Sequence, residues 1–146
     1  MRALLQRVSS ASVSVEDVEI AAVGPGLLVL LGVERGDSVE MATRLANKTA
    51  SLRVFPSEKK PMDRSVVDTG GSVLVVSQFT LAADVRKGNR PSFSDAAPPD
   101  EAEPLVNHYV NTLRQQITAV ATGRFGANMQ VALVNDGPVT LLLHQA

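Results

Sequence analysis

The chain has 146 residues and a net charge of −1, and 45% of its residues are hydrophobic while only 3% are aromatic. This length suits one domain with an aliphatic core, and the lack of cysteine excludes disulfides, a thiolate nucleophile and cysteine metal sites. No apolar run approaches the roughly 18 residues of a membrane span, and the first residues turn polar too early for a signal peptide, so we expect a cytoplasmic protein with no membrane contact. The near-neutral charge argues against a broadly basic RNA-binding surface.

The first part of the chain predicts strands. Residues 11–15 alternate between apolar and polar side chains, which is typical of a strand, and Glu16-Asp17 is turn-like. Gly24-Pro25-Gly26 breaks the chain before an apolar run that is typical of a strand buried on both faces. The predicted strands are 2–9, 11–15, 18–20 and 27–32.

Two main helices are predicted. The first spans about 38–51, with Asp37 as N-cap and Glu40 completing a capping box. The second opens at Asp100 with Glu103, after a proline-rich stretch, 82–99, that we interpret as a long functional loop. Inward-facing residues recur at helical spacing in both helices. They are Val39, Ala42, Leu45, Ala46, Thr49 and Leu52 in the first, and Leu105, Tyr109, Thr112, Leu113, Gln116 and Ile117 in the second.

The remaining segments predict further strands and turns. Gly70-Gly71 is a turn, and Gly123 and Gly126 bracket a loop. This order of strands and helices indicates a single α/β (α+β-like) domain, residues 1–146, with mixed β-sheets. The other predicted strands are 53–55, 72–78, 129–134 and 139–143, and 57–65 is predicted to be a loop.

Several kinds of catalytic site have no support in the sequence. The only histidines, His108 and His144, have no motif context, so a Ser-His-Asp triad is not indicated and His108 is best explained as a structural helix residue. Zinc-site, phosphate-loop and dinucleotide-binding motifs are also missing. We therefore expect neither a metal nor a cofactor.

The polar residues Ser77, Gln78, Phe79 and Thr80 follow the apolar run of strand 72–78. A strand that ends this way can turn consecutive backbone N–H groups toward a carbonyl oxygen and form an oxyanion hole. From the residues alone, a plain strand end explains the same pattern.

Gly137 and Pro138 interrupt the last two apolar strands. Proline lacks an N–H and seldom lies inside a sheet, so the pair marks either a functional backbone element or a hairpin turn that begins at Asn135-Asp136. Local basic residues leave two interpretations as well, a site for RNA or ordinary solvated charge. They are Arg86, Lys87 and Arg90 in one loop, and Arg124 elsewhere.

The ordered set of segments resembles the D-aminoacyl-tRNA deacylases, also known as the D-tyrosyl-tRNA(Tyr) deacylase family. The likeness covers nearly the whole chain. It is carried by Leu5-Gln6-Arg7-Val8, the strand 26–33, the segment 70–81, Arg90-Pro91-Ser92-Phe93-Ser94, Gly123-Arg124-Phe125-Gly126-Ala127 and the segment 135–140.

The resemblance implies a compact domain with a barrel-like core that pairs as a homodimer. It implies a cis Gly137-Pro138 peptide that enters the partner subunit's site and rejects L-amino acids by steric exclusion, because its carbonyl oxygens face the substrate's α-amino group. Arg7 matches an arginine expected to brace this element. Without the resemblance, Arg7 reads as an exposed charge at a strand end.

The resemblance also implies that the terminal adenosine of tRNA lies near residues 77–80, with backbone N–H groups at Phe79 and Thr80 holding the ester carbonyl. Thr80 matches a residue regarded as a possible nucleophile. The alternative, which we prefer, is catalysis by backbone groups with help from the ribose 2′-hydroxyl, because no base for Thr80 is evident.

The leading hypothesis is thus a carboxylic ester hydrolase that clears D-aminoacyl-tRNA, and also mischarged glycyl-tRNA, in translation quality control. Two other hypotheses remain: a catalytically inactive tRNA-binding module of the same fold, and a homodimeric scaffold protein. The enzyme hypothesis predicts release of D-tyrosine from D-Tyr-tRNA. The inactive module predicts tRNA binding without turnover, and the scaffold protein predicts neither activity.

Overall fold

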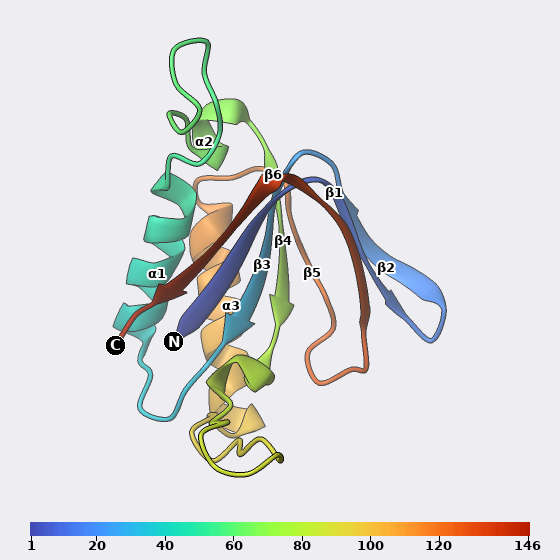
Figure 1. The fold of residues 1–146 in the computed structure, drawn as a ribbon, viewed down its shortest axis with the longest axis vertical. Coiled ribbons are helices and arrows are strands. Elements are labelled where there is room, and N and C mark those ends of the chain that lie inside the picture. Colours follow the sequence, from blue (N-terminus) through green and yellow to red (C-terminus); the bar gives the residue numbers. More distant parts are fainter.

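The computed structural model describes all 146 residues and shows a mixed six-stranded sheet with two long helices on one face (Figure 1). The strand order is β2-β1-β3-β4-β5, and β6 pairs with the other edge of β1. β1 is antiparallel to its three neighbours, whereas β3, β4 and β5 are parallel. The strands are β1 Arg2–Val15, β2 Val18–Val23, β3 Gly26–Gly32, β4 Ser72–Ser77, β5 Val120–Thr122 and β6 Gln130–His144; the helices are α1 Val39–Ser51, α2 Val66–Thr69 and α3 Pro99–Arg114, with a 3₁₀ turn η1 at Phe79–Ala82.

The central strand β3 is buried on both faces, as its apolar run predicts. Leu27, Val29 and Leu31 belong to the larger core cluster, which lies beneath α1 and α3. Leu28 packs on the opposite face in a second cluster with Val13 and other residues from the C-terminal half of β1. The long strands β1 and β6 therefore curl over the sheet and produce the barrel-like core (Figure 1).

The two long helices pack against each other through a buried polar pair. Tyr109 of α3 is fully buried, and its hydroxyl lies 2.7 Å from Oγ1 of Thr49 in α1. Because the Thr49 hydroxyl donates to the Leu45 carbonyl, it accepts from Tyr109. Both tyrosine and threonine were predicted to face the core, and burial raises the pKa of Tyr109.

Both predicted helix N-caps are wrong. Ser38, rather than Asp37, caps α1 by accepting from the Met41 N–H at 3.3 Å, while Asp37 bonds the Glu34 N–H at 2.6 Å and so closes the preceding turn. α3 begins at Pro99, before Asp100, with Pro98 at the N-cap position and no side-chain cap. Proline suits this first turn because its φ is preset and its missing N–H needs no partner there.

Some element boundaries also differ from the predictions. β1 is one strand rather than two, and β2 extends to Val23. Segment 53–55 is not a strand: Phe55 makes only an isolated bridge with Arg64. The short elements α2 and β5 were not predicted, and Gln116 is exposed beyond the end of α3. The elements α2 and β5 are too short for hydrophobic periodicity to reveal them.

The largest difference concerns the end of the chain. The segments 129–134 and 139–143 are not two strands of a hairpin: they form the single strand β6, and both pair with β1. The hairpin interpretation of Asn135-Asp136 is therefore wrong. Residues 135–138 lie within one long strand at the point where it bends (Figure 1).

The predicted fold class, one α+β domain with a mixed, barrel-like sheet and two main helices, is confirmed. None of its helices combines the length and apolar character needed to cross a bilayer.

Candidate active site

The end of β4 delivers the polar segment 77–80 to the surface. Ser77 is the last residue of the strand, and the Gln78 N–H still bonds the Leu31 carbonyl of β3 at 2.8 Å. The chain then turns into η1, where the Leu81 N–H bonds the Gln78 carbonyl at 3.2 Å. The N–H groups of Phe79 and Thr80 precede that bond, so they have no acceptor inside the turn. They are therefore the donors that this segment can offer to a ligand.

A mostly apolar cavity of about 600 Å³ lies beside this turn. Ser77, Gln78 and Phe79 form part of its wall, whereas Thr80 does not line it. Phe79 is 59% exposed, and its ring meets Phe93 edge to face, with centroids 5.1 Å apart. Exposed aromatic faces beside an apolar cavity suit the stacking of a nucleobase, since every base has a π-face.

Thr80 has no basic partner. Its hydroxyl accepts a hydrogen bond from the side-chain amide of Gln78, which cannot take a proton from it. His108 instead bonds Thr43 at 2.7 Å and links α3 to α1, and His144 bonds Glu34 at 3.0 Å. No group of three or more His, Asp or Glu side chains is arranged to hold a metal ion. The turn therefore offers backbone donors rather than an activated side chain.

Gly137 and Pro138 lie in a bulge of β6. In the pairing of β6 with β1, Gln6 is opposite Thr140 and Val8 is opposite Asn135. One residue of β1, Arg7, therefore faces the four residues 136–139 of β6. Such an excess of residues pushes the bulged strand out of the ladder and leaves backbone groups unpaired. Both Gly137 and Pro138 are exposed.

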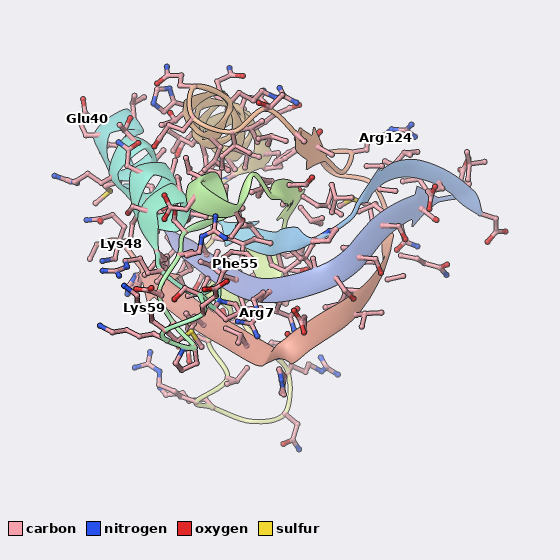
Figure 2. All side chains as sticks on the ribbon, turned by 90° about the horizontal axis from the view of Figure 1, so that it is seen from above. Arg7, Glu40, Lys48, Phe55, Lys59 and Arg124 are labelled. Carbon is pink, nitrogen blue, oxygen red and sulfur yellow. The ribbon has the colours of Figure 1, made fainter.

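Arg7 holds the bulge from below. Its Nε donates to the Asp136 carbonyl at 3.0 Å, and its Nη1 donates to the Val54 carbonyl at 2.7 Å. Its side chain is only 11% exposed, so Arg7 is not a free charge at a strand end. Figure 2 shows Arg7 near the loop of Phe55, whose neighbour in the chain, Val54, accepts the hydrogen bond from Nη1. The structure thus brings Arg7 together with the Gly137-Pro138 element.

The bulge is closed at its base and tightly packed at Gly137. The Asn135 side chain donates to Oγ1 of Thr140 at 2.9 Å and accepts from the Val139 N–H at 3.1 Å. Gly137 has φ +132°, a conformation that strains any L-residue, and a Cβ there would lie 3.0 Å from both the Arg7 guanidinium and the Val139 side chain, which would have to shift. The Gly137-Pro138 peptide is cis, as the resemblance implies.

The two parts of the predicted site lie at opposite ends of the sheet. Arg7 pairs with Leu27, which pairs with Val73, whereas Ser77 is four residues further along β4. At about 3.3 Å per residue and about 4.8 Å between strands, this places Ser77 roughly 13 Å along and 10 Å across the sheet from Arg7. In Figure 1 the bend of β6 is at the top of the sheet and η1 at the bottom. One chain does not bring residues 77–80 and Gly137-Pro138 together.

The loop after η1 carries the basic residues. Asp84 and Ser92 pair through two backbone hydrogen bonds of 2.8 and 2.9 Å, which makes residues 84–92 a closed hairpin, here called the basic hairpin. The Arg86 guanidinium hydrogen-bonds the Asp84 carboxylate and lowers the pKa of that carboxyl to about 2. Lys87 and Arg90 are exposed and make no ion pair.

Comparison with known proteins identifies the family. The family model described as D-Tyr-tRNA(Tyr) deacylase matches residues 4–144. The chain belongs to this family. It is 60% identical to a D-aminoacyl-tRNA deacylase of Roseiflexus sp. (strain RS-1), over 100% of this chain and 94% of that protein. It is 62% identical to a D-aminoacyl-tRNA deacylase of Syntrophotalea carbinolica, over 98% of this chain and 96% of that protein. The predicted family and enzyme class, a hydrolase, are confirmed.

Solved structures support the fold. A structure titled "c-Myc DNA Unwinding Element Binding Protein" matches with a TM-score of 0.95 and 42% identity, covering 100% of this chain and 99% of that chain. A probable eukaryotic D-amino acid tRNA deacylase matches with a TM-score of 0.81 over 97% of both chains. At 17% identity, that second likeness concerns the fold alone.

Sequence reasoning gave no role to three groups that shape the site. Phe93, which packs on Phe79, lies in the loop 82–99, whose proline content indicated function without naming a residue. The hydrogen bond between Asn135 and Thr140, here called the clamp, was not expected because the hairpin interpretation made Asn135 part of a turn. The Val54 carbonyl left no signal, because any residue supplies a carbonyl.

We expect Arg7→Ala to lower the free energy of unfolding by about 2–3 kcal/mol, because the Asp136 and Val54 carbonyls both lose a charged donor. The free energy of unfolding of Arg7→Lys should lie between those of Arg7→Ala and the unaltered protein, since one ammonium cannot reach both carbonyls. Urea unfolding measures the change. The control is Arg114→Ala, which removes an exposed arginine with one bond to the Val120 carbonyl and should cost no more than about 1 kcal/mol. Equal losses in Arg7→Ala and Arg114→Ala would contradict the bracing role.

Proposed function

We propose that this protein hydrolyses the ester bond of D-aminoacyl-tRNA and releases the free amino acid and tRNA. Membership of the deacylase family supports the reaction class. The observation that carries the proposal at the site is the η1 turn, which offers the N–H groups of Phe79 and Thr80 beside an apolar, aromatic-lipped cavity. The ligand that fits this combination is a nucleoside whose ribose carries an ester.

The proposed chemistry needs little from side chains. The terminal adenine occupies the cavity against Phe79, and the ester carbonyl points at the N–H groups of Phe79 and Thr80. Water attacks the carbonyl carbon, the N–H groups stabilise the oxyanion, and the ester C–O bond breaks as the ribose oxygen takes up a proton. One such donor typically lowers the barrier by about 3 kcal/mol. The adjacent ribose hydroxyl of the substrate helps to activate the water, because no histidine or carboxylate bonds Thr80.

The proposed chirality filter is the bulge of a second chain. Residues 77–80 and Gly137-Pro138 lie too far apart in one chain to contact one amino acid, since its carbonyl and amino groups are separated by two bonds. A homodimer in which each bulge enters the partner's site removes this difficulty. The Gly137 and Pro138 carbonyls then face the α-amino group, and an L-side chain collides with the backbone while a D-side chain points away. Exposed Val134 and Leu142 on β6 give this strand an apolar surface for the pairing.

Purified protein should release D-tyrosine from D-Tyr-tRNA and leave L-Tyr-tRNA intact. Glycyl-tRNA should also be hydrolysed, because glycine has no side chain for the filter to exclude. The measurement is deacylation of the three radiolabelled substrates. Equal rates on the two tyrosyl enantiomers would refute the filter, and tRNA binding without any turnover would favour the inactive-module hypothesis.

Thr80→Ala distinguishes the two catalytic mechanisms. The alanine variant keeps both backbone N–H groups, so backbone catalysis predicts that kcat falls by no more than about tenfold, whereas loss of a nucleophile typically costs 10⁴-fold or more. Thr80→Val, which keeps the shape, is the matched control for packing. A loss of several orders of magnitude in both variants would restore Thr80 as the nucleophile.

Mixing two damaged variants tests whether the site is shared between chains. Gly137→Val distorts the bulge against Arg7, and Phe79→Ala opens the cavity, so each homodimer should be inactive. If subunits exchange at random, half of the dimers are mixed and each has one intact shared site, which restores about a quarter of the wild-type activity. No recovery after confirmed exchange would mean that each site uses a single chain.

A further inference from the structure

The basic hairpin, residues 84–92, is the most cationic exposed segment near the cavity. Between Asp84 and Ser92 it carries Arg86, Lys87 and Arg90 and no acidic residue. Arg86 is neutralised by Asp84 in a bidentate pair, with N–O distances of 2.9 and 2.7 Å. Lys87 and Arg90 make no ion pair and no hydrogen bond to any part of the chain. Two exposed charges thus remain unused by the fold.

The hairpin is held in place at its base rather than hanging free. The two backbone bonds between Asp84 and Ser92 close it, and the Asp84 carboxylate also accepts from the Arg86 N–H at 3.0 Å. Because both oxygens of the Asp84 carboxylate bind the Arg86 guanidinium, Asp84 does not pair with the two free cations. Lys87 and Arg90 are therefore presented on a defined loop.

The hairpin also adjoins the cavity. It begins directly after η1, which carries Phe79, and it ends at Ser92, next to Phe93. Phe79 and Phe93 are the aromatic pair at the cavity. The hairpin, among the lowest loops in Figure 1, is thus joined at both ends to the residues that carry these two rings.

Another part of the cavity wall carries charge of the opposite sign. Pro98, Pro99 and Ala102, at the start of α3, form that wall. The same first turns carry exposed Asp100, Glu101 and Glu103. A polyanionic strand is repelled by these carboxylates and attracted by Lys87 and Arg90, so electrostatics favours the hairpin over the start of α3, although exposed Asp95 also lies near Arg86.

From this geometry we propose that the basic hairpin binds phosphates of the RNA strand that leads to the aminoacylated nucleotide, with Lys87 and Arg90 as the contacting cations. The proposal rests on the proposed function, because it takes the cavity as the site of the terminal nucleoside. It adds a defined docking surface: the 3′ strand of the tRNA passes over residues 84–92 rather than over the acidic first turns of α3.

The test compares Lys87→Ala/Arg90→Ala with Arg44→Glu. Arg44 is an exposed, unpaired residue of α1, and its replacement by glutamate changes the net charge by the same amount as the double variant. Binding of unacylated tRNA is measured over a series of KCl concentrations, and hydrolysis is measured on D-Tyr-tRNA and on the D-tyrosyl ester of adenosine, which has no phosphate.

The double variant should bind tRNA about tenfold more weakly at low salt, and its slope of log affinity against log KCl should shrink by about 1.5, corresponding to two lost phosphate contacts. The KM for D-Tyr-tRNA should rise by a similar factor with kcat unchanged. Hydrolysis of the adenosine ester should be unaffected, and Arg44→Glu should behave like the unaltered protein.

An unchanged salt slope in the double variant, or an equal loss in Arg44→Glu, would overturn the proposal. A loss of adenosine-ester hydrolysis in the double variant would also overturn it, since the hairpin would then act on the cavity itself. Failure of the proposed function gives a different result: the unaltered protein would hydrolyse neither the tRNA nor the adenosine ester, whatever the binding measurements show.

Discussion

The mismatch between β1 and β6, in which Arg7 alone faces residues 136–139, is the constraint on which the candidate site depends. The two strands pair on both sides of this point, so the extra residues of β6 cannot relax by slipping the register. They must leave the sheet, and an arginine that donates to the Asp136 and Val54 carbonyls fills the space beneath them. The fold itself therefore holds the Gly137-Pro138 backbone at the surface.

The second constraint is the length of β3 and β4. Both strands are buried on two faces, so their directions and registers are strongly determined, and they separate the bulge at one end from η1 at the other. Neither element is a free loop: the hydrogen bond between Asn135 and Thr140 closes the bulge, and only Gln78 separates η1 from β4. In the proposed homodimer, symmetry would place the bulge of each chain beside η1 of the other.

How much could be predicted from the sequence depended on the range of the interaction involved. Local apolar runs predicted β3 and β4, and helical spacing predicted the buried faces of α1 and α3, because these signals lie within one element. The cap of α1 was predicted wrongly because Asp37 and Ser38 are both good cap residues, and Asp37 is instead used by the Glu34 N–H and by the distant N-terminal ammonium of Met1. The bulge was interpreted as a possible hairpin because Asn-Asp-Gly-Pro is locally a turn sequence. Only the pairing of both flanks with β1, more than a hundred residues away, shows that the chain continues in one direction.

When main-chain atoms contact a substrate, the identity of the contacting residues matters less. The residues that hold this backbone in position then determine which sequences can form the site. Gly137 and Pro138 would act through carbonyls that any residue possesses, yet the positive φ of Gly137 and the close Arg7 and Val139 side chains favour glycine there. Arg7 in turn requires the Val54 carbonyl, and the clamp requires an amide at Asn135 and a hydroxyl at Thr140. The same reasoning applies to η1. The backbone N–H groups of Phe79 and Thr80 have no partner within the turn, because they precede its first hydrogen bond, from the Leu81 N–H to the Gln78 carbonyl. Substitutions at these supporting residues should therefore alter selectivity and rate without changing any atom that touches the substrate.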